Sequence, residues 1–447
     1  MGFAFDFDRC RQFVENGNFY STAGKVTQVI GLTIMVQGIK GFVGEVCRIL
    51  LDGKGSAVMA EVVGFRDRQV LLMPLGDLKG VGSGCKVIPT GKALTIQAGE
   101  DLLGKVLNGL GEPMEEEERG IALSRESCPV DRTPPNPLKR NRITNIMPTG
   151  IRAIDGLLTC GEGQRIGIFS GSGVGKSTLL GMISRYCKAD VNVIALIGER
   201  GREVRDFIEK DLGEDGLKKS VVVCVTSDQP ALVRIKGAYV ATTIAEYFRD
   251  RGKKVMLMMD SVTRFAMAKR EVGLAIGEPP ATKGYTPSVF AELPRLLERS
   301  GTSERGSITA FYTVLVDGDD MNEPISDAVR GILDGHIVLS RKLAGQNHFP
   351  AIDVQQSISR LAREITSANQ DQMAGEIRNS LAVYEKSEDL INIGAYAKGS
   401  NPQIDRAIAL NGPINDFLTQ DVTERVEYND TLQRMQEILK KGPGEGK

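Results

Sequence analysis

Residues 166–177 read Ile-Gly-Ile-Phe-Ser-Gly-Ser-Gly-Val-Gly-Lys-Ser, an apolar run that passes into a glycine-rich loop ending in Lys-Ser. Glycines at such spacing let the backbone curl so that successive N–H groups face one anion. A helix starting near Gly175 would add the positive end of its dipole, and Lys176 adds a full charge. The order of strand, loop and helix therefore predicts an α/β domain that binds the phosphates of a nucleoside triphosphate.

The loop and the first helical turn are the predicted nucleotide-binding residues. The Ser177 hydroxyl is suited to ligating Mg²⁺ beside the phosphates. The usual pattern opens with glycine, and Ser170 stands at that position, where a small side chain should still fit. A chance glycine turn is the alternative, but strand, loop, Lys-Ser and helix all occur in order. The predicted contacts are Gly171, Ser172, Gly173, Val174, Gly175, Lys176, Ser177 and Thr178.

A second apolar run, residues 254–260, ends in an acid. Its sequence, Lys-Val-Met-Leu-Met-Met-Asp, fits a strand that brings the Asp260 carboxylate to a phosphate-bound Mg²⁺. The alternative is an ordinary buried strand whose aspartate caps the next helix. The loop some 80 residues upstream favours the metal-binding interpretation.

The apolar run 191–197 is followed by Gly-Glu-Arg-Gly-Arg-Glu-Val at residues 198–204. A carboxylate that orients and polarises water lowers the barrier to hydrolysis. Glu199, at the end of the strand after the loop helix, is placed to face the γ-phosphate. The alternative for Glu199 is a solvated charge in a charged stretch.

Gly-Glu-Arg after the loop helix resembles the catalytic β-type subunits of rotary ATPases, whose non-catalytic α-type subunits carry Gln where this chain has Glu199. Residues 350–360, Pro-Ala-Ile-Asp-Val-Gln-Gln-Ser-Ile-Ser-Arg, match the α/β ATPase signature. Residues 279–290, 347–353 and 394–408 are similar to type III protein-export ATPases, above all the flagellar branch, with the injectisome branch as the near alternative. The resemblance covers about residues 20 to 440.

This resemblance implies roles for four further residues. Arg360 matches an arginine finger that crosses a subunit boundary to stabilise transition-state charge, and a surface arginine is its alternative. Arg200 matches a residue that approaches the γ-phosphate. Phe349 sits where catalytic subunits stack an aromatic ring on adenine, with a plain core phenylalanine as the alternative. Phe417 would complete the base pocket.

The resemblance also implies an assembly and a location. One chain holding both Glu199 and Arg360 calls for a closed head-to-tail ring, which the family makes a homohexamer. The implied partners are a regulatory stator-like export protein, a coiled-coil central stalk protein, a membrane export gate, and export substrates with their chaperones. The implied location is the cytoplasm, peripheral to the inner-membrane export apparatus.

Composition agrees with a multidomain intracellular enzyme. The 447 residues carry 56 Lys and Arg against 57 Asp and Glu, which does not favour a bulk nucleic-acid binder. No apolar run is long enough to span a bilayer, and the N-terminus lacks a signal-peptide pattern. The seven scattered cysteines predict buried reduced thiols rather than disulfides or a zinc site.

The predicted fold is multidomain α/β. Residues 1–20 form an amphipathic helix that docks on a partner or on the chain's own barrel, residues 21–92 a small β-barrel, and residues 93–360 a RecA-like ATPase domain. Residues 361–440 are helical, and residues 441–447 form a disordered tail. Five runs predict barrel strands: 25–30, 32–36, 43–50, 57–63 and 69–73.

Two loops of the predicted ATPase domain carry further expectations. The Pro-rich connector 129–148, with Lys139, Arg140 and Arg142, is interpreted as a solvated loop. The Gly- and Pro-rich segment 277–287 is expected to be a loop between helices. By resemblance this second loop faces a central channel.

Three functions compete at this stage. The first is a homohexameric export ATPase that couples ATP hydrolysis to chaperone release, unfolding and export of proteins. The second is a hexameric RNA translocase, which would need a basic, aromatic-bearing barrel, whereas residues 21–92 offer little clustered charge. The third is a subunit of a rotary H⁺ or Na⁺ ATPase, and Glu199 argues against a non-catalytic one.

Overall fold

A computed structural model describes residues 22–51, 56–115, 125–316, 318 and 320–441 of the chain. The chain divides into two compact units, Met1–Leu94 and Thr95–Lys447. The predicted N-terminal helix, residues 1–20, lies outside the described residues, as does the tail from residue 442.

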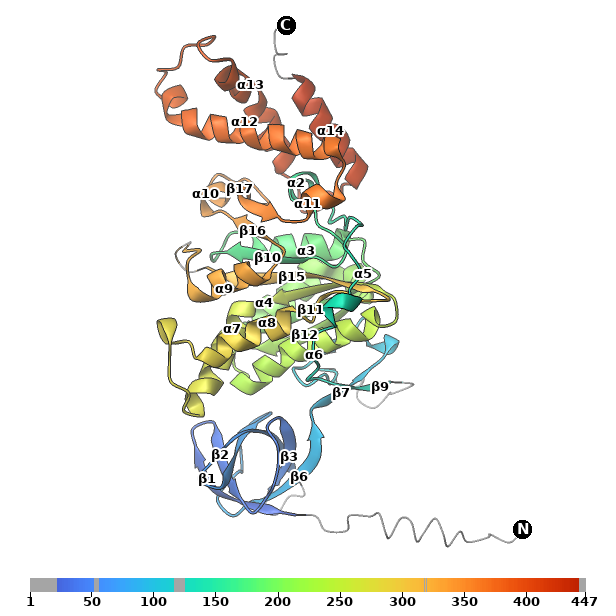
Figure 1. The fold of residues 1–447 in the computed structure, drawn as a ribbon, viewed down its shortest axis with the longest axis vertical. Coiled ribbons are helices and arrows are strands. Elements are labelled where there is room, and N and C mark those ends of the chain that lie inside the picture. Colours follow the sequence, from blue (N-terminus) through green and yellow to red (C-terminus); the bar gives the residue numbers. More distant parts are fainter. Residues whose placement is uncertain (1–21, 52–55, 116–124, 317, 319, 442–447) are drawn as a thin grey trace, which may run out of the picture. The chain divides into compact units, whose positions relative to one another are not determined.

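The first unit contains a closed six-stranded antiparallel barrel with strand order β1-β2-β5-β4-β3-β6 (Figure 1). Its apolar core includes Ile34, Ile49 and Leu72, which are fully buried. This confirms the predicted barrel. Its strands are β1 (Gly24–Ile30), β2 (Thr33–Gln37), β3 (Glu45–Leu50), β4 (Ala57–Arg66), β5 (Gln69–Pro74) and β6 (Lys86–Ala93).

The second unit is built on one large sheet with path β17-β16-β10-β15-β13-β11-β12-β8, in which β14 pairs with β15 (Figure 1). Neighbours from β16 to β8 run parallel, whereas β17 and β14 are antiparallel to their partners. A small separate sheet joins β7 to β9. The strands are β7 (Thr95–Ala98), β8 (Val106–Leu107), β9 (Glu126–Pro129), β10 (Arg165–Ser170), β11 (Val191–Glu199), β12 (Ser220–Thr226), β13 (Lys254–Asp260), β14 (Gly301–Thr302), β15 (Ser307–Leu315), β16 (Gly335–Leu339) and β17 (Ile352–Ser359).

Helices follow most of these strands, so loops gather at the carboxyl edge of the parallel sheet, where α/β proteins bind ligands. Residues 277–287 form the expected connection between α7 and α8, with one short turn inside it. The helices are α2 (Arg152–Leu157), α3 (Lys176–Tyr186), α4 (Gly201–Asp206), α5 (Gly213–Lys218), α6 (Ala231–Arg249), α7 (Val262–Ala275), α8 (Pro287–Leu297), α9 (Pro324–Ile332), α10 (Arg341–Gly345), α11 (Ala362–Ile365), α12 (Ala368–Asn392), α13 (Pro402–Leu418) and α14 (Tyr428–Lys441).

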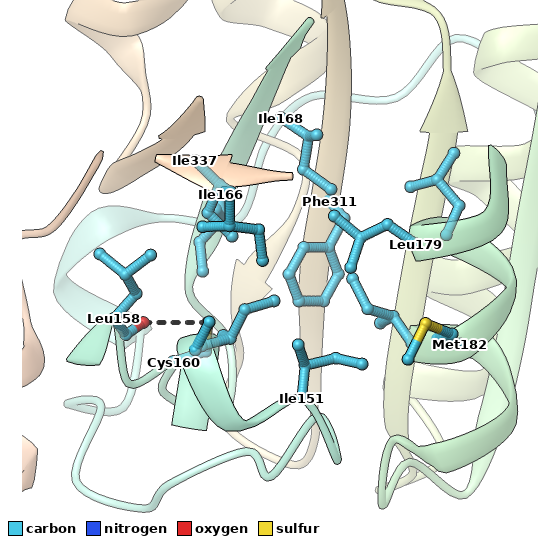
Figure 2. Packing of buried hydrophobic residues seen from close by; sticks show 14 of the residues in the cluster. Ile151, Leu158, Cys160, Ile166, Ile168, Leu179, Met182, Phe311 and Ile337 are labelled. Carbon is cyan, nitrogen blue, oxygen red and sulfur yellow. Dashed lines mark hydrogen bonds between the residues drawn. The ribbon is translucent and has the colours of Figure 1, made fainter. Parts of the chain in front are cut away.

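The core of the second unit extends from the sheet into the C-terminal helices. Figure 2 shows Ile166 and Ile168 of β10 packing with Leu179 and Met182 of α3. The same cluster includes Leu410 from α13, as well as residues of α12 and α14. The helical region and the nucleotide-binding region therefore share one continuous apolar core.

The connector 129–148 differs from expectation at Arg140. Its guanidinium donates to the carbonyl oxygens of Ser300, at 2.7 Å, and Glu298, and the side chain is only 18% exposed. Arg140 is thus a structural anchor between chain segments rather than part of a solvated loop. Lys139 stays exposed, as predicted.

In the described part of the chain, no helix combines the length and the apolarity needed to cross a bilayer. The cysteines described by the structure are free and buried, as predicted: Cys47, Cys85, Cys128, Cys160, Cys187 and Cys224.

Candidate active site

The glycine-rich loop joins the end of β10 to the start of α3. Gly173 and Gly175 adopt φ angles of 79° and 83°, in the left-handed region where a side chain would be strained. Gly175 is the N-terminal cap of α3, so the helix dipole points its positive end at the loop. Ser170 ends β10 with 1% exposure, so its small side chain fits in place of the usual glycine.

Lys176 and Asp260 are in direct contact above the sheet. The Lys176 ammonium donates to Asp260 Oδ1, and the Thr313 hydroxyl donates to the same oxygen at 2.7 Å. Thr313 lies on β15, the strand between β10 and β13, so it bridges the gap between the lysine's loop and the acid's strand. Ser261, not Asp260, caps α7, because its Oγ accepts from the Arg264 amide. The capping alternative for Asp260 is therefore wrong.

Glu199 is the third member of this charged cluster. It ends β11, the strand next to β13, and its Oε1 lies 3.9 Å from Lys176 Nζ. The side chain is only 12% exposed. Burial, followed by the nearby Asp260 carboxylate, raises the pKa of Glu199 to about 7, although Lys176 acts in the opposite direction. A carboxylate with a pKa near neutrality is suited to general-base chemistry.

The donors at the loop fit a magnesium ion better than an all-protein metal cage. Ser177 stands in the first turn of α3, and the Asp260 carboxylate is held beside the loop by its contact with Lys176. Among the described residues there is no group of three or more His, Cys, Asp or Glu that could hold a metal. Mg²⁺ typically takes one or two protein carboxylates and completes its shell with phosphate and water oxygens.

A cavity of about 610 Å³ opens beside the loop. Gly173, Gly175 and Thr178 line one side, and Phe349, 37% exposed, lines another. A ring wall next to a phosphate loop suits a flat nucleotide base. The remaining lining residues are Leu179, Met182, Asn347, Pro350, Thr419, Gln420, Asp421 and Val422.

Phe417 does not line this cavity. Its side chain is fully buried in the core, where its ring packs close to Gly156 and near Met435. The prediction that Phe417 completes the base pocket is corrected: residues 419–422, just after it, line the cavity instead.

The two candidate arginines do not join the cluster. Arg200 is 80% exposed and pairs with Glu203 on α4 at 3.6 Å. Arg360 is exposed just after β17, and its Nη2 donates to the Arg330 carbonyl at 3.2 Å.

Sheet register puts Arg360 at the opposite edge from the loop. Its amide donates to Asp334, whose own amide donates to Arg165 at the start of β10. The loop leaves the other end of β10, after Ser170, and the intervening five residues of strand span about 17 Å. Within one chain, Arg360 and Lys176 therefore lie at opposite ends of the sheet.

Sequence reasoning missed Thr313 and the wall 419–422. Thr313 reads as one more residue of an apolar strand, and nothing in its spacing signals a bond to Asp260. The wall lies some 240 residues after the loop, in an irregular segment without a motif.

Three stretches of the chain match family models. Residues 26–91 match the beta-barrel domain of the ATP synthase alpha/beta family, and residues 150–359 match its nucleotide-binding domain. Residues 366–437 match the C-terminal domain of the T3SS ATPase EscN.

Curated relatives and solved structures agree. The flagellum-specific ATP synthase of Bacillus subtilis (strain 168) is 56% identical over 422 residues, 94% of this chain and 95% of the relative. The type 3 secretion system ATPase of Xanthomonas euvesicatoria is 51% identical over 93% of each chain. The structure of the assembled ATPase EscN from enteropathogenic E. coli has a TM-score of 0.88 at 46% identity, covering 93% of this chain and 100% of that chain. EscN in complex with its central stalk EscO gives 0.86 at the same identity and coverage.

The fold, the loop and these matches define the class: the chain belongs to the ATP synthase alpha/beta family. Within it, the chain is an ATPase of the type III protein-export group, in which both flagellar and injectisome relatives occur. This agrees with the resemblance in the sequence and with the predicted fold class.

Proposed function

We propose that this chain hydrolyses ATP with Mg²⁺ as a homohexameric ring that drives chaperone release, unfolding and export of proteins by a bacterial flagellar export apparatus. The observation that carries the proposal is Glu199, a largely buried carboxylate with a pKa of about 7 beside Lys176 at the phosphate loop. The flagellar assignment is supported by two flagellar relatives at 56% identity, against 51% for a type 3 secretion relative, although other flagellar relatives are 45–48% identical.

In the proposed reaction the loop amides and Lys176 hold the β- and γ-phosphates, and Ser177 and Asp260 hold the metal. Mg²⁺ supplies a Lewis acid that neutralises developing charge on the phosphate oxygens. Lys176, which contacts Asp260 in this structure, turns its ammonium toward the phosphates when ATP binds. Glu199 accepts a hydrogen bond from the attacking water and aligns it with the γ-phosphorus.

Arg360 completes the site of a neighbouring copy. Its position at the far edge of the sheet supports this role, because no contact with the chain's own loop is available to it there. If Arg360 of one copy meets the phosphate loop of the next copy, the two copies use different surfaces and the interface is heterologous. Repeating such an interface closes into a ring when the rotation between neighbouring copies permits. Arg200, exposed beside Glu199, approaches the γ-phosphate at that interface, and Phe349 stacks on the base.

The proposed partners of the ring follow from its membership of the type III protein-export ATPases. The likeness to EscN bound to its central stalk EscO supports a coiled-coil stalk in this ring, near the loop 277–287. A stator-like regulator at residues 1–20, the membrane export gate, and substrates with their chaperones complete the proposal. The ring would work in the cytoplasm, against the inner-membrane export apparatus.

Replacing Glu199 with Gln tests the catalytic assignment. Gln keeps the shape but cannot accept a proton, so turnover of Mg-ATP by the purified chain should fall by about 10²-fold or more. The affinity for ATP, measured by calorimetry, should change less than about threefold, because Glu199 does not hold the phosphates.

The matched control is Glu209→Gln on the same charged segment, where Glu209 is exposed and pairs with Arg205. That variant should turn over at the wild-type rate. Near-normal turnover in Glu199→Gln would show that another group activates water, and the proposed mechanism would be wrong.

A further inference from the structure

One wall of the cavity belongs to residues 417–424, here named the C-terminal strap, which consists of the last two residues of α13 and the irregular segment after them. It leaves the end of α13 and runs toward α14 without helix or strand after Leu418. Ordering such a segment costs conformational entropy, so favourable contacts must hold it where a base would stack. Three sets of contacts hold the strap in place.

Arg152, in the first turn of α2, makes the first anchor. Its side chain is 3% exposed, and its Nε donates to the Phe417 carbonyl at 2.8 Å. Its Nη2 donates to the Thr419 carbonyl, and its Nη1 pairs with Glu424. One buried guanidinium thus contacts the strap at its start, its middle and its end.

Gln420 makes the second anchor, from within the strap. Its Nε2 donates to the Gly150 and Glu424 carbonyls, both at 2.8 Å, and its Oε1 accepts from the Arg152 amide at 2.9 Å. Its backbone amide donates to the Phe349 carbonyl at 2.9 Å. The strap and the aromatic wall of the cavity are therefore joined directly.

The last turn of α3 makes the third anchor. The Tyr186 hydroxyl and Arg185 Nη2 each donate to the Val422 carbonyl at 2.9 Å. The same helix begins at Lys176, so one rigid element carries the phosphate-binding lysine at one end and holds the strap at the other.

We propose that Arg152, Gln420 and Tyr186 are positioning residues for nucleotide binding, which preorganise the C-terminal strap as the wall that packs on the base. This inference rests on the proposed function and deepens it. The anchors hold the strap and make none of these contacts to the phosphate loop, so their loss should weaken recognition of the base and leave recognition of the phosphates intact. A preorganised wall spares the ligand the cost of ordering it.

The test compares two ligands that are not hydrolysed by the site: Mg-ADP, which carries a base, and Mg-pyrophosphate, which does not. Each is titrated calorimetrically into the full chain. Tyr186→Phe removes a single hydrogen bond at the surface, so it should fold normally and weaken ADP binding about threefold. Gln420→Glu sets a carboxylate against two carbonyls and should weaken ADP binding about tenfold or more. Pyrophosphate affinity should change less than about twofold in both variants.

Tyr396→Phe is the matched control, because Tyr396 also donates to a carbonyl at 2.9 Å, that of Asn401, but between α12 and α13. It should bind both ligands as the wild type does. Equal losses for ADP and pyrophosphate, or no loss for ADP in either anchor variant, would overturn the positioning role. If the wild type itself binds ADP no more tightly than pyrophosphate, the base pocket in the proposed function fails as well. If the wild type binds ADP more tightly than pyrophosphate and both anchor variants keep that difference, only the positioning role is refuted.

Discussion

Two carboxylates and one ammonium share a half-buried space at the phosphate loop. Lys176 contacts Asp260 directly, whereas its Nζ lies 3.9 Å from Glu199 Oε1. Glu199 is left with burial and a like charge, and both disfavour its ionised form. The cluster thereby separates the carboxylates into a metal-ligand candidate and a proton-accepting candidate.

The raised pKa of Glu199 predicts a pH dependence. The carboxylate form accepts the water proton, so kcat/KM should fall about tenfold per pH unit below about 7 and level off above it. The measurement is steady-state ATPase activity at limiting Mg-ATP between pH 5.5 and 8.5, a range set by this pKa.

Thermal unfolding without nucleotide gives an independent check on the same pKa. A folded-state pKa raised from 4.5 to about 7 means that the folded chain holds the proton more tightly than the unfolded chain. That contribution to stability is complete below pH 4.5 and is lost as the pH rises through 7. The Glu199→Gln variant lacks it, so its melting temperature should gain on the wild type across this window. An unchanged difference would mean an ordinary Glu199 pKa.

At single residues, the sequence predicted what depends on local order. Lys176, Glu199 and Asp260 each follow an apolar run, and ends of parallel strands meet at one edge, so their meeting was predictable. The burial of Phe417 in the core was not predictable, because the side of a helix that faces the core depends on tertiary packing. The catalytic and binding roles of these residues remain predictions.

At the scale of elements, the strands with unbroken apolar runs were the easiest to predict. The run 254–260 became β13 without change, whereas β6 (Lys86–Ala93) was not anticipated. It contains Pro89 and Gly91, which are uncommon within strands, and most of its side chains are at least partly exposed. Closure of the barrel, a tertiary constraint, outweighs these local preferences.

Arg299 illustrates how elements of the second unit are fastened. It is fully buried and pairs with Glu246 of α6 at 3.0 and 2.7 Å, while donating to Val130 and Thr243 at 2.9 Å each. Replacing Arg299 with Ala leaves the buried Glu246 carboxylate to Arg132, which is partly exposed and whose Nη1 lies 3.5 Å from Glu246 Oε2. The change should cost about 3 kcal/mol. Urea unfolding followed by circular dichroism measures this as a lower midpoint.

The double variant Arg299→Met/Glu246→Gln removes both charges and should recover a large part of the loss. The exposed pair Lys188–Glu427 serves as a comparison, because Lys188→Ala should lower the unfolding midpoint far less than Arg299→Ala does. If Arg299→Ala proved as mild as Lys188→Ala, the buried pair would not be the fastening that its geometry suggests.

At the scale of the whole molecule, the second unit has two chemically different ends. The loop, Glu199 and the cavity gather at the carboxyl edge of the sheet, and Arg360 lies at the other edge. Under the proposed role of Arg360, the loop end of one copy would be completed by the Arg360 end of the next copy.

Mixing two inactive variants tests this shared-site claim most directly. Glu199→Gln removes the proposed water-activating carboxylate from the loop end, and Arg360→Ala removes the proposed arginine finger from the other end. A ring of either variant alone should therefore be nearly inactive. In a mixed ring, interfaces that pair an intact loop end with an intact Arg360 should restore up to about a quarter of the wild-type rate per subunit for random equimolar mixing. ATPase activity against mixing ratio measures it, with wild-type activity rising steeply with concentration as the ring assembles. A mixture no more active than its components, with a wild-type rate per subunit independent of concentration, would contradict a site shared between copies.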